Sequence, residues 1–192
     1  LQQIQIQRGV GTSTNGAGSF GSSINLSTIA TNSKSFASAR FGVGSFGTQS
    51  ASLSFGTGLL DGKFGLDGSL SRIGSDGYID RARSDLKNLY LSCYYFFKSS
   101  SIRLNVLSGS EITYQAWNGV PYQYRNDLKL RRYNVSGTEK SGEPHDNEVD
   151  DYGQNHFQLL FKNQLSSQLH QNLTLHYTKG KGYFEQYKAD QS

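Results

Sequence analysis

Residues 88–107 read NLYLSCYYFFKSSSIRLNVL, and this stretch decides the fold class. The odd-numbered positions in 89–97 carry large apolar side chains or cysteine, and the even-numbered ones mix polar and aromatic residues. After the polar pair at 98–99, apolar residues again occupy every second position in 102–106. Such alternation indicates β-strands with one apolar face, because successive side chains of a strand point to opposite faces. The stretch therefore predicts two antiparallel strands joined by a tight turn.

The same period of two recurs along most of the chain from residue 35 onward. Seven segments follow it, and we predict one strand for each: 35–44, 48–59, 63–73, 85–97, 100–114, 152–165 and 171–183. A helix would instead place apolar residues every three to four positions. We therefore expect an all-β fold, with antiparallel up-and-down strands that pair with their sequence neighbours.

The composition is unusual for a packed soluble domain. Hydrophobic residues make up only 35% of the 192 residues, yet the chain has 22 glycines, 12 tyrosines, 11 phenylalanines and only 2 prolines. Disordered chains are poor in aromatics and rich in proline, so we expect order. No apolar run approaches the ~20 residues of a membrane helix, but alternating segments of about 10 residues are typical of membrane β-barrels. Because the chain opens at Leu1 without a signal peptide, we expect a processed or longer protein.

The connections between the predicted strands also differ in length. After a first short link at 45–47, short turns are predicted at 60–62, 98–99 and 166–170, and longer loops at 73–84 and 115–151. Bacterial outer-membrane barrels have short periplasmic turns and long extracellular loops. We therefore predict that the longer loops are extracellular, although a soluble β-sandwich would also contain alternating strands.

The alternation assigns side chains to two faces. An Arg or Lys on a lipid face costs about 2–4 kcal/mol at mid-membrane, so Arg103 and Lys162 fix the wet face of their strands. Toward lipid we expect Leu53, Phe55, Leu66, Leu89, Leu91, Leu104, Val106, Leu159, Phe161, Leu173 and Leu175. Toward the lumen we expect Ser52, Ser54, Asp67, Asn88, Arg103, Asn105, Gln158, Lys162 and His176.

The glycine-rich N-terminal segment carries a family resemblance. Residues 8–28, RGVGTSTNGAGSFGSSINLST, resemble the end of the plug domain of TonB-dependent outer-membrane receptors. The fitting positions are Arg8, Gly9, Thr12, Gly16, Gly18, Phe20, Gly21, Ile24, Asn25 and Thr28. The segments 113–121, TYQAWNGVP, and 175–188, LHYTKGKGYFEQYK, resemble members from the Bacteroidetes, a Gram-negative group.

The resemblance implies a fold and partners. Residues 1–34 would be the end of the plug domain, and residues 35–192 the first seven strands of a 22-stranded transmembrane barrel in the cell outer membrane. The implied partners are outer-membrane lipid, the remainder of the same barrel, and TonB, which would bind a box outside this chain. Arg8, Gly9, Gly16, Gly18, Gly21 and Asn25 would form the plug–barrel motif.

The implied function is active import of a scarce ligand of the siderophore–iron, haem or cobalamin class, driven by inner-membrane energy. A passive porin or adhesin-like barrel and a soluble β-sandwich binding module remain alternatives. We expect no enzyme activity, because no catalytic constellation is visible. The scattered basic residues, with a net charge of +4, do not predict a nucleic-acid surface, and Cys93 is the only cysteine.

Candidate ligand contacts lie in the long loop at 115–151. Arginine beside aromatic rings suits carboxylate, catecholate or sugar recognition, although aromatics near a membrane surface also form girdles. The candidates are Trp117, Tyr122, Tyr124, Arg125, Arg131, Arg132 and Tyr133.

Two other motifs resemble a cofactor site and a metal site, but each lacks a feature that such a site requires. The G-x-G-x-x-G matches at 16–21 and 42–47 are not followed by a predicted helix, so we predict turns there and no dinucleotide cofactor. The acidic stretch at 145–151 lacks the spacing of a calcium loop, and we interpret it as solvated.

Overall fold

The computed structural model describes residues 3–9, 21–27 and 32–189. The chain divides into two units, Leu1–Ser33 and Lys34–Ser192, and each is described by itself. In the first, β1 (Gln3–Arg8) pairs antiparallel with β2 (Ser22–Ser27). No helix in the described residues is long and apolar enough to cross a membrane.

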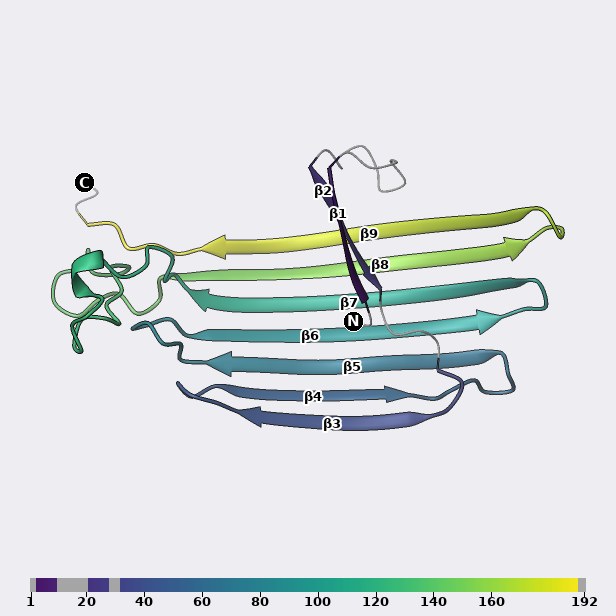
Figure 1. The fold of residues 1–192 in the computed structure, drawn as a ribbon, viewed down its shortest axis with the longest axis horizontal. Coiled ribbons are helices and arrows are strands. Elements are labelled where there is room, and N and C mark those ends of the chain that lie inside the picture. The colour runs from purple at the N-terminus through teal and green to yellow at the C-terminus, as the bar shows by residue number, and fades with distance from the viewer. Residues whose placement is uncertain (1–2, 10–20, 28–31, 190–192) are drawn as a thin grey trace. The chain divides into compact units, whose positions relative to one another are not determined.

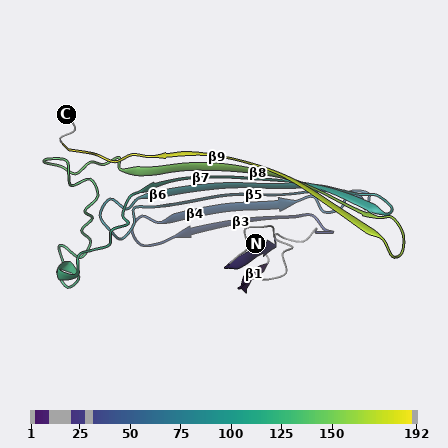
Figure 2. The same cartoon turned by 90° about the horizontal axis from the view of Figure 1, so that it is seen from above.

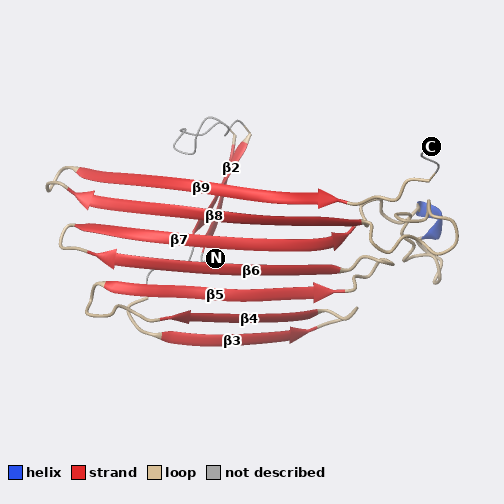
Figure 3. Cartoon of the chain, turned by 180° about the vertical axis from the view of Figure 1, so that it is seen from behind, coloured by secondary structure: helices blue, strands red, loops and turns tan. Residues whose placement is uncertain are grey.

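The second unit is a single antiparallel sheet of seven strands in sequence order (Figures 1 and 3). The strands are β3 (Phe36–Val43), β4 (Gln49–Gly56), β5 (Phe64–Ser75), β6 (Ser84–Phe96), β7 (Ser100–Tyr114), β8 (Val149–Gln164) and β9 (His170–Phe184). Seen from above, these strands form one layer (Figure 2). The predicted all-β fold with neighbour pairing is confirmed. The sheet is open within the described residues, with β3 and β9 as its edges.

Several strand ends differ from the prediction. β4 ends at Gly56 because Gly58 takes a φ of +69°, which leaves the extended conformation. β5 and β6 extend further than predicted, so their loop shrinks to residues 76–83, nearly the length of the β4–β5 connection at 57–63. The predicted contrast between those two connections is therefore wrong. The contrast between the turns at 97–99 and 165–169 and the loop at 115–148 is confirmed.

The strand register places each predicted set of side chains on one face. Residues directly opposite each other in neighbouring strands project to the same side. Leu70 lies opposite both Leu53 and Leu89, while Asn105 lies opposite both Ser92 and Gln158. We call the side with the leucines the apolar face and the opposite side the polar face.

Burial on the two faces is inverted relative to a protein folded in water. On the apolar face Leu104 and Leu175 are 43% and 55% exposed. On the polar face Asp67, Ser92 and Asn105 are 8%, 1% and 6% exposed. On the inner strands, these polar side chains are thus packed while leucines of the other face are left uncovered, whereas on the edge strand β9 both faces are exposed.

The apolar face is not uniform along the strands. We call the part nearer the short turns the apolar band: Leu53, Phe55, Leu66, Leu70, Leu89, Leu91, Leu104, Val106, Phe157, Leu159, Phe161, Leu173, Leu175 and Tyr177. Nearer the long loop the same face carries a charged zone, made of Arg72, Asp85, Lys87, Asp151, Lys179 and Lys181. Only the register across strands brings these six residues together.

Candidate functional site

A row of polar side chains crosses the polar face from β5 to β9. Its members are directly opposite one another in the register: Asp67, Ser92, Asn105, Gln158 and His176. The Ser92 hydroxyl donates to the Asn105 Oδ1 at 2.8 Å, and the Asn105 amide donates to the Gln158 Oε1 at 3.2 Å. The middle three members of the row therefore form a hydrogen-bonded chain across β6, β7 and β8.

At its β5 end the row finishes with Asp67, which lies next to Tyr94. The Tyr94 ring lies over Gly65. A Cβ at Gly65 would clash with that ring, so only glycine admits it. The Asp67 Oδ1 and the Tyr94 hydroxyl are both buried, and the two groups interact with each other. This corner of the polar face is therefore closed by an acid–phenol pair.

At the opposite end from the short turns, the β5–β6 loop is tied to the β7–β8 loop (Figure 1). The Arg81 Nη2 donates to the carbonyl oxygens of Asn134 and Ser136 at 2.6 and 2.9 Å. In return, the Asn134 side-chain amide donates to the carbonyls of Asp80 and Gln115 at 3.1 and 3.2 Å. These contacts give the long loop a defined shape on the sheet.

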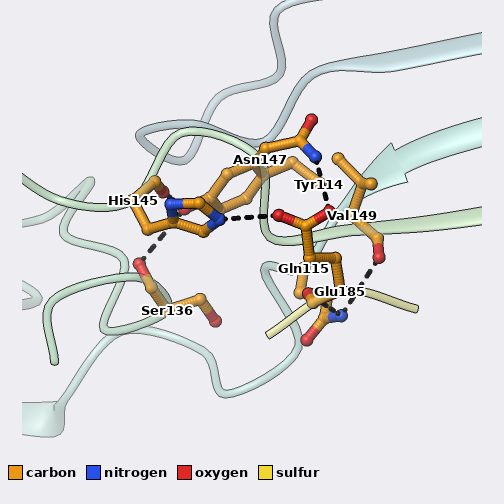
Figure 4. A network of polar contacts seen from close by, with 7 residues as sticks. All are labelled: Tyr114, Gln115, Ser136, His145, Asn147, Val149 and Glu185. Carbon is orange, nitrogen blue, oxygen red and sulfur yellow. Dashed lines mark hydrogen bonds and ion pairs between the residues drawn. The ribbon is translucent and has the colours of Figure 1, made fainter. Parts of the chain in front are cut away.

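The segment after β9 is joined to the same loop by a second network, shown in Figure 4. The Glu185 carboxylate contacts the His145 Nε2 and accepts a hydrogen bond from the Asn147 amide, both at 2.9 Å. The Gln115 amide donates to the carbonyls of Val149 and Glu185 at 3.3 and 3.1 Å, and the Tyr114 hydroxyl donates to the His145 carbonyl. The β5–β6 loop (76–83), the β7–β8 loop (115–148) and the segment after β9 thus join at this end of the sheet, and we call them together the cap.

The structure separates the seven predicted loop residues by their surroundings. The Arg132 Nε donates to the Tyr78 carbonyl at 2.6 Å and lies 3.5 Å from the Asp80 carboxylate, so its role is internal to the cap. Tyr124 and Tyr133 pack edge to face, with ring centroids 5.7 Å apart.

The other four predicted residues are exposed. The Arg125 guanidinium lies 4.0 Å from the centroid of the Tyr122 ring, whereas Arg131 and Trp117 have no such ring contact among the described residues. The seven residues therefore do not converge on one site.

Trp117 borders a hollow of about 460 Å³ in the cap. Phe184, Glu139 and Glu148 also line it. Its chemistry is thus acidic and aromatic rather than basic. Burial, reinforced by the Glu139 carboxylate, raises the pKa of Glu148, while His145 and Arg81 oppose the shift.

The raised pKa of Glu148 predicts a pH-dependent cap. The folded state holds the proton more tightly than the unfolded chain, where a glutamate titrates near about 4.3. Stability should therefore rise as pH falls from neutral through the raised pKa, and the gain should end below the unfolded value. Glu148→Gln should stabilise the cap at neutral pH and flatten this profile, measured as proteolysis of the 115–148 loop from pH 5 to 8. Glu139→Gln should reduce the dependence only partly, and an unchanged profile in Glu148→Gln would contradict the assignment.

The plug–barrel motif falls partly on the described hairpin. Arg8 lies opposite Ser22, and Asn25 lies opposite Gln5. The Gly9 N–H donates to the Gly21 carbonyl at 2.8 Å, with Gly9 at a φ of +83°. Gly16 and Gly18 lie outside the described residues, as do Thr12, Phe20 and Thr28.

The remaining motifs are placed as follows. Residues 42–47 form the end of β3 and the turn to β4, with no helix after them, as predicted. Among the described residues, no group of three or more His, Cys, Asp or Glu side chains could hold a metal ion.

Sequence reasoning missed the residues that build the cap. Their partners are backbone carbonyls, one histidine and one asparagine amide, and no local spacing marks the four residues Arg81, Asn134, Gln115 and Glu185. The sequence offers only a weak indication of such residues: asparagine and glutamine in a long loop can both donate to and accept from backbone groups.

Comparison with family models finds no match for this chain, and comparison with curated proteins finds none either.

Proposed function

We propose that residues 34–192 form part of a transmembrane β-barrel in a bacterial outer membrane. The observation that carries the proposal is the inverted burial on the inner strands, where Leu70 and Leu104 are 49% and 43% exposed while Ser92 and Asn105 are buried. Soluble proteins rarely expose contiguous apolar patches larger than a few hundred Å². A hydrocarbon medium on the apolar face and a wet lumen on the polar face remove this conflict.

The length of the apolar band supports the same proposal. The apolar alternation that starts at Leu89 on β6 runs to Phe97, the residue just after the strand, and a tilted strand needs about 9–11 residues to cross a membrane. Beyond the band the strands continue toward the cap with Ser108, Ser110 and Lys181 on that face. Strands that project past the bilayer into water need such polar side chains. Because the long loop lies at the same end, we propose that the cap end is extracellular.

The open edges require a partner. Unpaired strand edges are not tolerated in hydrocarbon, so β3 and β9 must pair with further strands, here proposed to be the remainder of the same barrel. The resemblance at 8–28 gives that barrel 22 strands and makes the β1–β2 hairpin the end of its plug.

The activity we propose is TonB-dependent import of a scarce ligand of the siderophore–iron, haem or cobalamin class. The glycine-rich segment at 8–28 favours it over a passive porin or adhesin-like barrel, which needs no plug. Residues 34–189 contain a single sheet, so no second sheet within this unit covers Leu89 and Leu91, as a soluble sandwich would require.

An uptake experiment tests this activity. Cells that produce the complete receptor should accumulate one of three labelled ligands, a ferric siderophore, haem or cobalamin, and lose that uptake when TonB is deleted. The matched control is a strain that lacks the receptor and keeps TonB. Uptake that survives TonB deletion would favour a passive barrel, and a chain purified as a detergent-independent monomer would favour the sandwich.

A further inference from the structure

The apolar face holds a hollow of about 520 Å³ at the border between the apolar band and the charged zone. Its floor is formed by Ala39, Phe41, Leu53, Leu70 and Leu89, from β3 to β6. Arg72, Lys87 and the hydroxyl residues Ser108 and Ser110 also line it. The hollow thus joins an apolar surface to a cationic and hydroxyl-bearing edge.

The register places the two kinds of side chain in consecutive rows. Leu53, Leu70 and Leu89 lie directly opposite one another in one row. One step further toward the cap, Arg72 lies opposite Lys87. An amphiphile lying along the strands would meet apolar side chains first and positive charge next.

The charge at this edge exceeds what its own carboxylate neutralises. The Asp85 carboxylate accepts from the Arg72 Nε at 2.7 Å and lies 3.2 Å from the Lys87 ammonium, so one negative charge faces two positive ones. The Arg72 and Lys87 side chains remain 65% and 55% exposed. A guanidinium has five N–H donors, and two of those on Arg72 bind Asp85, so the others can bind a ligand.

The excess of positive charge continues across the sheet. Lys181 lies in the same register row as Lys87, and Lys179 lies one step nearer the apolar band. Asp151 is the second carboxylate of the zone. Four basic and two acidic side chains therefore give the charged zone a net positive charge just beyond the apolar band.

We propose that this hollow binds an anionic lipid of the membrane leaflet nearest the cap, with an acyl chain on the leucine floor and a phosphate at Arg72 and Lys87. The inference rests on the proposed function, which places the apolar face in a bilayer. Guanidinium groups bind phosphate oxygens bidentately, and basic residues beside anionic headgroups each strengthen binding about fivefold. A zwitterionic lipid would gain from the floor but not from the net charge.

Three soluble probes separate the contributions of chain and charge. The purified protein in a neutral detergent is titrated by calorimetry with dihexanoyl phosphatidic acid, dihexanoyl phosphatidylcholine and inorganic phosphate. We expect the phosphatidic acid to bind at least tenfold more tightly than either other probe. Equal binding of the two lipids would overturn the charge assignment, and equal binding of inorganic phosphate would overturn the lipid assignment.

Two variants of opposite expected sign test the site itself. Lys87→Gln should weaken binding of the phosphatidic acid about fivefold, and Asp85→Asn should strengthen it by a similar factor, because each changes the local charge by one. A merely structural role would make both variants worse binders, and that result would overturn the proposal. Lys162→Gln, which removes a charge from the polar face, should leave binding unchanged.

Folding of each variant is checked by insertion into phosphatidylcholine vesicles. A chain that inserts but shows no preference for the phosphatidic acid contradicts only this inference. A complete wild-type receptor that does not insert contradicts the proposed function.

Discussion

Replacing Leu104 by arginine is expected to destabilise the barrel folded in a lipid bilayer by about 2–4 kcal/mol. Leu104 is 43% exposed on the apolar face, and it lies opposite Cys93 on β6 and Leu159 on β8. Its surroundings are therefore apolar on both sides, and no described carboxylate lies in its register row. An arginine there would place an unpaired charge at the middle of the apolar band.

The measurement is denaturant unfolding of the vesicle-inserted barrel, with Leu104→Ala to separate lost packing from added charge. His176→Arg is the matched control on the polar face, since His176 is exposed there. Asn105 is a poorer control because it is 6% exposed and hydrogen-bonded to Ser92 and Gln158. If Leu104→Arg folds as well as His176→Arg, the apolar face does not meet lipid.

The strands were predictable because alternation is a local signal. The segment at 100–114 was predicted with both ends correct, since a tight turn precedes it and a change of pattern follows it. The end of β4 was missed because a glycine at Gly58 can either continue a strand or leave it, and its positive φ depends on the surroundings. The parity of side chains survived these errors, because an end that shifts does not change which face a residue occupies.

The charged zone could not be predicted in the same way. Arg72 and Lys87 lie inside the predicted strands 63–73 and 85–97, and the alternation already places each on the side of its leucine neighbours. Only the pairing of β5 with β6 shows that the two side chains lie directly opposite each other. Pairing depends on the register, which a single sequence constrains weakly.

The candidate ligand residues show a similar limit. Composition correctly singled out the long loop as rich in arginine and aromatic residues. It could not distinguish Arg132, which binds a carbonyl and a carboxylate inside the cap, from Arg125, which lies exposed on Tyr122. That distinction depends on the β5–β6 loop, whose residues are distant in sequence.

Replacing Arg81 by alanine is expected to loosen the cap by about 3 kcal/mol. Arg81 donates hydrogen bonds to the carbonyls of Asn134 and Ser136, and its Nε lies 3.3 Å from the Tyr114 hydroxyl. A hydrogen bond to a charged group contributes about 1.5–3 kcal/mol, and bonds that share one guanidinium are not additive. The 115–148 loop would lose its main tie to the β5–β6 loop, while the strands would keep their pairing.

Hydrogen exchange of the amides in 132–148 measures this loosening as a local opening free energy. Arg81 has a φ of +56°, a conformation that costs a non-glycine residue roughly 1–2 kcal/mol. Arg81→Gly should therefore lose the same contacts as Arg81→Ala but recover about 1 kcal/mol of backbone strain. Arg81→Lys, which keeps the charge and loses the fork geometry, should fall between wild type and alanine. If all three variants exchange like the wild type, the cap is held by the Glu185 network instead, since Glu185 binds both His145 and Asn147 independently of Arg81.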